Sequence, residues 1–262
     1  MSRPVALVRE VPDSFVSCVT SHPVSPPLDP DKALEQHAEY VAALEAGGFA
    51  VIRVPAAEAH PDCSFIEDTA VVVGRRALLT NPGHASRRGE VSGVGVVLSA
   101  WVAVEAMGAG TLDGGDVLQV GGRVFAGRSA RSDAAGIEAL AGFCTPIEVV
   151  PVPVRATLHL KSGVSALDDE TVLWHPAACS GDVFTGLRVI EVPGADPEAA
   201  NVVRLPDGSI LVAAHQAVTA DLVASLGYRA RPVDVSEFAR ADGGLTCLSL
   251  RLRSVTVVSS AS

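Results

Sequence analysis

One arrangement of segments recurs along this chain, and it constrains the fold more than any other feature. An apolar strand, a short polar turn and a second apolar strand occur in succession four times. The four pairs are 69–73 with 77–80, 117–120 with 124–126, 164–167 with 171–174, and 202–205 with 209–213. Modules of this kind follow one another about every 37 to 50 residues, a period typical of solenoids and propellers.

Helical segments that end at glycine and lead into a further strand alternate with these hairpins. The first helix is predicted over 30–46, the second over 134–141 and the third over 217–226, followed by strands over 49–54, 147–152 and 228–235. The segments 5–9 and 248–252 can pair and complete a fifth unit. The sequence therefore predicts an α/β fold in which ββαβ modules close into a ring, within one domain over residues 1–262.

The composition excludes several classes of function. The chain carries a net charge of -10, which disfavours nucleic acid and acidic lipid as partners. Its longest uncharged stretch, 91–104, is shorter than the roughly 20 residues of a membrane-spanning helix. The number of cysteines is odd and none is spaced as CxxC, so no disulfide framework or structural zinc site is expected. A reducing, cytoplasmic compartment is the simplest interpretation.

The longest irregular segment lies near the start of the chain, over 11–29. It is rich in proline and serine. A loop of this length is often a lid or a binding loop, although an ordinary surface connection fits the pattern equally well.

Four polar segments directly precede apolar strands, and each has an ordinary explanation when taken alone. The segment 61–68 carries Asp62, Glu67 and Asp68, which a solvated loop would also explain. The segment 112–117 places two glycines between Asp113 and Asp116, as a plain glycine turn would. His159, between two leucines, could be a core histidine, and Cys247, at the end of a glycine-rich turn, could be an inert thiol.

Together the four segments form a coherent catalytic set. They occupy corresponding junctions of the repeat, so a closed ring would bring them to one end. They supply a nucleophile, a base, an acid that could orient the base, and further carboxylates suited to binding a guanidinium group. No P-loop, HExxH or GxSxG motif is present, and the pair Gly93 and Gly95 lacks the third glycine of a dinucleotide-binding motif.

The motifs FIED, SRR, LDGGDV, LHLKS and DGGLTC, in this order, resemble the dimethylarginine dimethylaminohydrolase family of guanidino-modifying enzymes. The resemblance implies a five-bladed α/β-propeller with pseudo-fivefold symmetry. It also implies that Cys247 is the nucleophile, His159 the catalytic histidine and Asp113 its acidic partner, where some relatives have glutamate. By the same resemblance, the cationic groups of the substrate are bound by Asp62, Glu67 and Asp68, and its α-carboxylate by Arg87 and Arg131.

The implied reaction is hydrolysis of an N-omega-methylated L-arginine to L-citrulline and methylamine or dimethylamine. It would pass through a covalent thiouronium on Cys247 and need no cofactor or metal. The partner is then a small molecule rather than a nucleic acid or membrane, and the resemblance allows a homodimer. Hydrolysis of arginine itself remains an alternative, as does a ligand-binding or protein-interaction propeller without catalysis.

Overall fold

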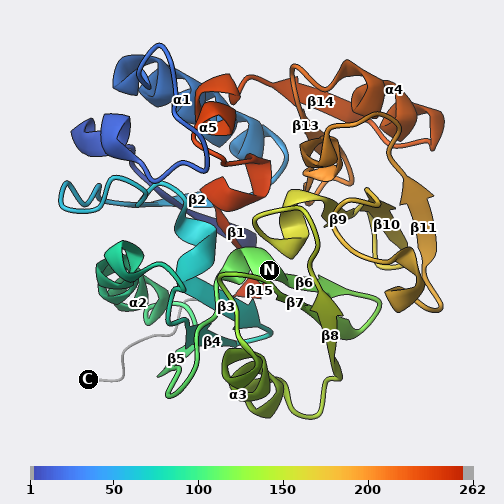
Figure 1. Cartoon of the computed structure of the whole chain (residues 1–262), viewed down its shortest axis with the longest axis horizontal. Coiled ribbons are helices and arrows are strands. Elements are labelled where there is room, and N and C mark those ends of the chain that lie inside the picture. The colour runs from blue at the N-terminus through green and yellow to red at the C-terminus, as the bar shows by residue number, and fades with distance from the viewer. Residues whose placement is uncertain (1–2, 256–262) are drawn as a thin grey trace.

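The computed structural model describes residues 3–255, and within them the strands form five three-stranded sheets around a central axis (Figure 1). The sheet orders are β15-β1-β2, β3-β4-β5, β6-β7-β8, β11-β10-β9 and β12-β13-β14. The strands are β1 (Arg3–Arg9), β2 (Ala50–Val54), β3 (Ala70–Val73), β4 (Arg76–Leu79), β5 (Ala103–Ala106), β6 (Val117–Val120), β7 (Arg123–Arg128), β8 (Val149–Pro153), β9 (Val164–Ala166), β10 (Thr171–Trp174), β11 (Arg188–Glu191), β12 (Val203–Arg204), β13 (Ile210–Ala213), β14 (Ala230–Val233) and β15 (Leu250–Val255). The predicted five-bladed α/β-propeller is confirmed.

Every sheet has the same connectivity. Its middle strand pairs antiparallel with the inner strand and parallel with the outer one. A parallel neighbour requires a crossover connection, usually a helix. Four sheets use one: α1 (Pro30–Ala46), α2 (Val91–Leu98), α3 (Ala134–Cys144) and α4 (Ala217–Ser225). The β10–β11 crossover contains only a 3₁₀ helix, Gly181–Val183, so the repeat is not uniformly ββαβ. A fifth α-helix, α5 (Ser236–Arg240), follows β14.

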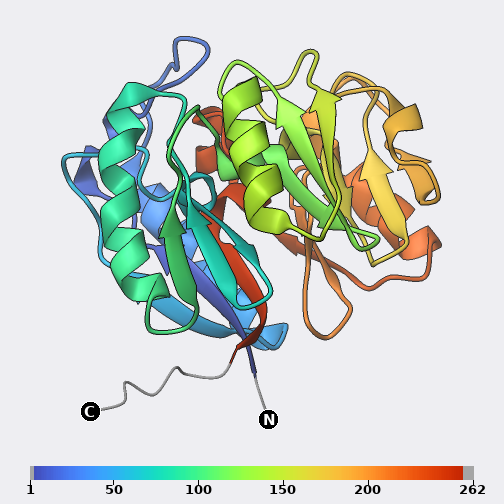
Figure 2. The same ribbon diagram turned by 90° about the horizontal axis from the view of Figure 1, so that it is seen from below.

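The two ends of the chain share one sheet, which closes the ring. β1 and β15 run antiparallel, with Val5 opposite Leu252 and Leu7 opposite Leu250. The two strands lie side by side at the lower edge of Figure 2. This is the pairing predicted between the leading and trailing apolar segments, and it completes the fifth sheet.

Local signals account for the bounds of α1. The Asp29 side chain caps its first turn by accepting from two backbone N–H groups, and Pro30 occupies the first position. The helix ends at Gly47, and Gly48 follows with φ 105°, a left-handed conformation that favours glycine. Tyr40 and Leu44 are buried on the face toward the core. The prediction of a helix over 30–46 is therefore confirmed.

Two helices depart from the sequence prediction. α3 continues past Gly142 to Cys144, because Phe143 and Cys144 extend its buried face. α2 and β5 occupy the uncharged stretch around 91–104 and were not predicted. A Cβ on Gly95 would lie 2.7 Å from Leu79, so the small residue lets α2 pack tightly on its sheet.

None of the helices between residues 3 and 255 is long and apolar enough to span a bilayer.

A short 3₁₀ helix precedes the inner strand of each sheet, and these five turns gather at one end of the ring. They are η2 (Ile66–Thr69), η4 (Gly114–Asp116), η5 (Leu160–Ser162), η7 (Pro197–Ala200) and η8 (Leu245–Leu248). Neighbouring turns contact one another, and the Asn201 side chain bonds to Thr246 to join η7 to η8. The repeat thus brings segments that are far apart in sequence to a single place.

Candidate active site

A pocket of about 120 Å³ lies at the end of the ring where the 3₁₀ helices meet. Six of the eight predicted site residues line it: Asp62, Asp68, Arg87, Arg131, His159 and Cys247. Asp113 is buried directly behind His159, and Glu67 faces a different cavity. The structure therefore brings together seven of the eight side chains that the sequence singled out, from four different sheets.

His159 and Asp113 form a fixed acid–imidazole pair. His159 Nε2 donates to Asp113 Oδ2 at 3.0 Å. The other carboxylate oxygen, Oδ1, accepts from the backbone N–H of Gly83 at 2.8 Å, and the Asp113 N–H donates to Ser132 Oγ at 3.1 Å. Asp113 has no exposed surface. These bonds hold the carboxylate so that it orients the imidazole, as an acid partner of a catalytic histidine must.

The electrostatics of the pocket favour a protonated His159. Burial opposes its charge, but the Asp68 carboxylate and the hydrogen bond to Asp113 outweigh burial and raise the pKa of His159 to about 9. The imidazole is therefore an imidazolium at neutral pH and can act as a general acid. The same interaction acts on Asp68. Burial would raise the pKa of its carboxyl, but the positive charges of His159 and Arg87 outweigh burial and lower this pKa to about 2.

Three donor atoms of this network have the spacing of a metal site. Asp68, Asp113 and His159 each place one such atom within 4.8 Å of the others. All three groups already have hydrogen-bonding partners, because Asp68 accepts from Arg87 and from the Gly115 N–H, and Asp113 accepts from His159 and from the Gly83 N–H. The arrangement is that of an ion network, in which the imidazolium and Arg87 are the cations.

The two glycines of the LDGGDV motif serve close packing. Neither Gly114 nor Gly115 adopts a positive φ, so a left-handed conformation is not the reason for glycine here. A Cβ on Gly114 would lie 2.0 Å from the carbonyl oxygen of Glu67, and one on Gly115 would lie 2.7 Å from His159 Nδ1. Only glycine lets the backbone pass this close to the catalytic imidazole and to Asp68.

Cys247 lies in η8 and points its sulfur into the pocket. The Gly244 N–H donates to its Sγ at 3.4 Å, and the residue is partly exposed. Burial of the thiol, with the negative charges of Glu67 and Asp68, raises the pKa of Cys247 to about 12. The thiol is therefore protonated at neutral pH, and a cation bound beside it would favour the nucleophilic thiolate.

The guanidinium of Arg87 donates most of its hydrogen bonds to groups of the protein itself. Its Nε and Nη2 donate to the two carboxylate oxygens of Glu90 at 3.0 and 2.8 Å, and its Nη1 donates to Asp68 Oδ2. Nη2 also donates to the carbonyl oxygen of Phe65 at 2.8 Å. Glu90 was not among the predicted residues, although its i,i+3 spacing from Arg87 could have indicated the pair. Arg87 thus bridges Asp68 and Glu90, and its role in binding the α-carboxylate stays a prediction.

Asp116 is a second buried carboxylate that the sequence prediction left without a role. It accepts from the hydroxyls of Ser129 and Ser132 at 2.6 Å each and from the Leu160 N–H at 2.9 Å. Burial raises its pKa against the effect of the imidazolium and these bonds. Asp116 joins the loop of Asp113 to the turn that begins at His159, and its place in LDGGDV was the available signal.

The predicted lid, 11–29, contributes residues 19–21 to the pocket wall. The Val19 N–H donates to Asp62 Oδ1 at 3.1 Å, and Ser21 Oγ donates to Asp242 Oδ1 at 3.0 Å. Asp242 adopts a φ of 58°, rare outside glycine, in the turn before Cys247.

Arg131 also lines the pocket. Its Nη1 lies 3.8 Å from Asp113 Oδ2, so its guanidinium is held by fewer protein groups than that of Arg87.

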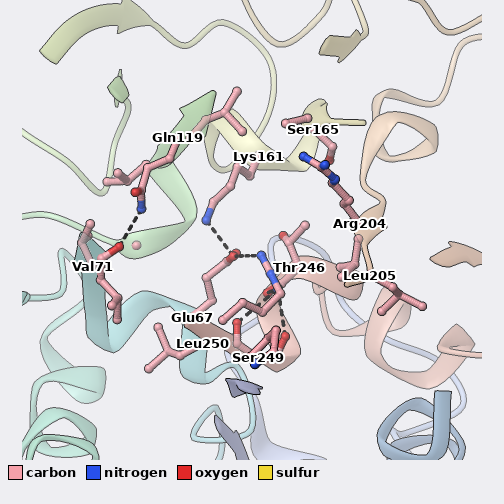
Figure 3. Close-up of a pocket in the computed structure, with 18 of the residues that line it drawn as sticks. Glu67, Val71, Gln119, Lys161, Ser165, Arg204, Leu205, Thr246, Ser249 and Leu250 are labelled. Carbon is pink, nitrogen blue, oxygen red and sulfur yellow. Dashed lines mark hydrogen bonds and ion pairs between the residues drawn. The ribbon is translucent and has the colours of Figure 1, made fainter. Parts of the chain in front are cut away.

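Glu67 faces away from this pocket. Its Oε1 accepts from Lys161 Nζ at 2.6 Å and from Arg251 Nη2 at 3.0 Å, at the floor of a separate central cavity (Figure 3). It thus neighbours Asp68 in sequence but is bound by two cations of the protein. The sequence could not distinguish these two adjacent acids.

Comparison with known proteins identifies the family. A family model described as Arginine deiminase matches residues 61–195. The dimethylarginine dimethylaminohydrolase of Streptomyces coelicolor is 40% identical over 257 residues, covering 95% of this chain and 96% of that protein. The chain belongs to the dimethylarginine dimethylaminohydrolase family. Membership places it among hydrolases that act on guanidino groups.

Other members of the dimethylarginine dimethylaminohydrolase family agree in sequence and in structure. The enzyme of Pseudomonas aeruginosa is 33% identical over 250 residues, covering 94% of this chain and 98% of that protein. A cysteine-to-serine variant of the enzyme from that organism, in complex with citrulline, superposes with a TM-score of 0.89 at 31% identity, over 96% of this chain and 100% of that one. A cyanobacterial arginine dihydrolase domain shares the fold, with a TM-score of 0.86 at 21% identity.

Proposed function

We propose that this protein hydrolyses N-omega-methylated L-arginine to L-citrulline and methylamine or dimethylamine. The observation that carries the proposal is one pocket containing a cysteine thiol, an imidazolium paired with a buried acid, and a second buried carboxylate beside them. The 40% identity to the Streptomyces enzyme over nearly its whole length supports the same substrate class.

The proposal assigns the two ends of the substrate to different groups. Asp68 binds the guanidinium through charge-assisted hydrogen bonds and directs its central carbon toward Cys247. Arg131 binds the α-carboxylate, and Asp62 receives the α-amino group beneath the lid. Arg87 keeps the Asp68 carboxylate in place rather than carrying the substrate by itself. Glu67 is assigned no direct substrate contact, since it lines the central cavity, where its Oε1 accepts from Lys161 and Arg251.

The reaction then follows from the charges. The bound cation lowers the pKa of the Cys247 thiol, its proton leaves to solvent, and the thiolate adds to the guanidinium carbon. The imidazolium of His159 protonates the alkylated nitrogen as its bond to carbon breaks, releasing the amine and leaving a thiouronium on sulfur. Neutral His159 removes a proton from water, and the resulting hydroxide adds to the same carbon. The carbon–sulfur bond then breaks to return the Cys247 thiolate, and the hydroxyl proton passes to solvent, which gives citrulline.

A second candidate is hydrolysis of arginine itself, which the match to the arginine deiminase family model favours. The two activities differ in the leaving group, ammonia against an alkylamine. Citrulline formation should be measured from asymmetric dimethylarginine, monomethylarginine and arginine, with Cys247→Ser as the control. Turnover of the methylated substrates alone supports the proposal. Turnover of arginine alone assigns the deiminase reaction, and no turnover of any of the three contradicts both.

A further inference from the structure

A second cavity lies on the axis of the propeller, on the other side of the 3₁₀ helices from the pocket. It has a volume of about 590 Å³ and is lined by the inner strands β3, β6, β9, β12 and β15 (Figure 3). Glu67 and Thr246 lie at its floor, and their sequence neighbours Asp68 and Cys247 face the pocket. One layer of short turns therefore separates two cavities, and the proposed reaction uses only one of them.

The central cavity is a positive region of an acidic protein. Five charged side chains line it: the cations Lys161, Arg204 and Arg251 and the acids Glu67 and Asp169. Three positive charges against two negative ones leave an excess of one positive charge, whereas the whole chain carries -10. A bound group with one negative charge would balance the cavity.

Hydrogen-bonding capacity is available at the same place. Lys161 is buried, and an ammonium has three N–H donors, of which the 2.6 Å bond to Glu67 uses one. Gln119 Nε2 donates to the Val72 carbonyl at 2.8 Å, which leaves the amide oxygen of Gln119 as an acceptor. The walls between these groups are apolar and are formed by Val71, Val117, Leu118, Leu205 and Leu250.

We propose that the central cavity is a second ligand site, for a small monocarboxylate with a short aliphatic body. The carboxylate binds at Lys161, and the aliphatic part contacts the apolar inner strands. A volume of about 590 Å³ lies within the range of small-molecule sites. A doubly charged anion such as phosphate would exceed this charge balance by one negative charge, which is why the balance selects a monoanion.

Binding of sodium butyrate to the intact protein tests this site without any measurement of turnover. Calorimetry and thermal unfolding should show saturable binding and a rise of Tm with butyrate concentration, because a ligand that binds the folded state stabilises it. Sodium chloride at equal ionic strength and butylammonium chloride, with the same aliphatic chain and the opposite charge, should give neither effect. Equal stabilisation by chloride, or the absence of saturable butyrate binding, would overturn the proposal.

Two variants place the ligand in the cavity. Lys161→Met should raise the Kd for butyrate about tenfold or more, since it removes a charge-assisted hydrogen bond. That change also alters the ion pair of Glu67, so Ala166→Phe, which fills the cavity from β9, provides an independent block with the same expected loss. Val96→Phe adds a comparable ring on exposed α2 and should leave the affinity unchanged. Unchanged affinity in both cavity variants would exclude the site.

A third variant separates this site from the pocket, where Arg131 could also bind a carboxylate. Arg131→Ala should retain butyrate binding with the affinity of the wild type. Loss of binding in that variant would assign the butyrate to the pocket and overturn the second site, whatever the outcome of the activity measurements.

Discussion

The pocket and the central cavity are built from the same short turns but present different chemistry. The pocket holds about 120 Å³ and contains Cys247, His159 and Asp68, whereas the cavity holds about 590 Å³ and contains Glu67 and Lys161. In the larger space, Glu67 Oε1 accepts from Lys161 and Arg251, and no cysteine or histidine is among the described residues that line the walls. In the smaller one, a thiol lies beside an imidazolium and a carboxylate. The comparison teaches that the position of a nucleophile in an ion network, rather than cavity size, locates catalysis.

The largest expected effect tests whether the pocket carries the chemistry. Cys247→Ser should lower kcat/KM by ~10⁴-fold or more, because a serine hydroxyl is a far weaker nucleophile without a strong base. Citrulline formation measures the loss, and thermal unfolding should show a nearly unchanged Tm. Cys144→Ala, in the core at the end of α3, is the control and should stay close to wild-type activity. Near-normal turnover by Cys247→Ser would remove the nucleophile assignment.

The next effect concerns the acid/base group. His159→Ala should lower kcat by ~10³-fold, since it removes the proton donor for amine departure and the base for hydrolysis of the intermediate. Single-turnover measurement of amine and citrulline release should show both steps slowed. An amine burst of wild-type size would restrict His159 to the second step, and normal turnover would exclude it from the mechanism.

Two neighbours on one turn give the sharpest comparison of the two cavities. Asp68→Asn should lower kcat/KM by ~10²-fold or more, because it removes the carboxylate that binds the guanidinium. Glu67→Gln, an equal change one residue away, should lower it by less than ~10-fold, since its carboxylate bonds to Lys161 and Arg251. Equal losses in the two variants would mean that Glu67 also contacts the substrate.

A smaller change is expected at the amino-acid end of the substrate. Arg131→Ala should raise KM by about tenfold or more with little change in kcat, because a lost contact with the α-carboxylate weakens substrate and transition state alike. Steady-state kinetics with monomethylarginine measures both constants. An unchanged KM would argue against the carboxylate role and favour a purely structural contact with Asp113.

The most gradual effect is that of pH. The pKa of His159 is raised from 6.5 to about 9, so the imidazolium should be lost, and kcat should fall, as the pH rises through about 9. The stability that comes from this raised pKa is complete below about pH 6.5 and is lost as the pH rises from there through about 9. Thermal unfolding from pH 6 to 10 should show a Tm decline that His159→Ala lacks. A Tm that falls equally in the variant would contradict this origin.

Much of the fold could be predicted because its repeat is local. Short apolar runs on either side of a polar turn marked the hairpins, and helical spacing of apolar residues that ends at Gly47 marked α1. The elements that were missed lacked such signals. α2 lies in a run that is apolar on nearly every side, and the β10–β11 crossover forms no α-helix at all. Hydrophobic periodicity cannot assign a helix or a strand to a segment that has no regular pattern of apolar and polar residues.

The residues of the site were also present in the sequence, and family resemblance gave each of them a role. What the sequence by itself determined was this set and its recurrence at the start of successive inner strands, because these depend on residue type and spacing. Only the tertiary structure decided which side chains meet. On one turn of four residues, Glu67 and Asp68 line different cavities, and Lys161, the partner of Glu67, comes from another module of the ring. That pairing depends on closure of the ring, which no local pattern specifies.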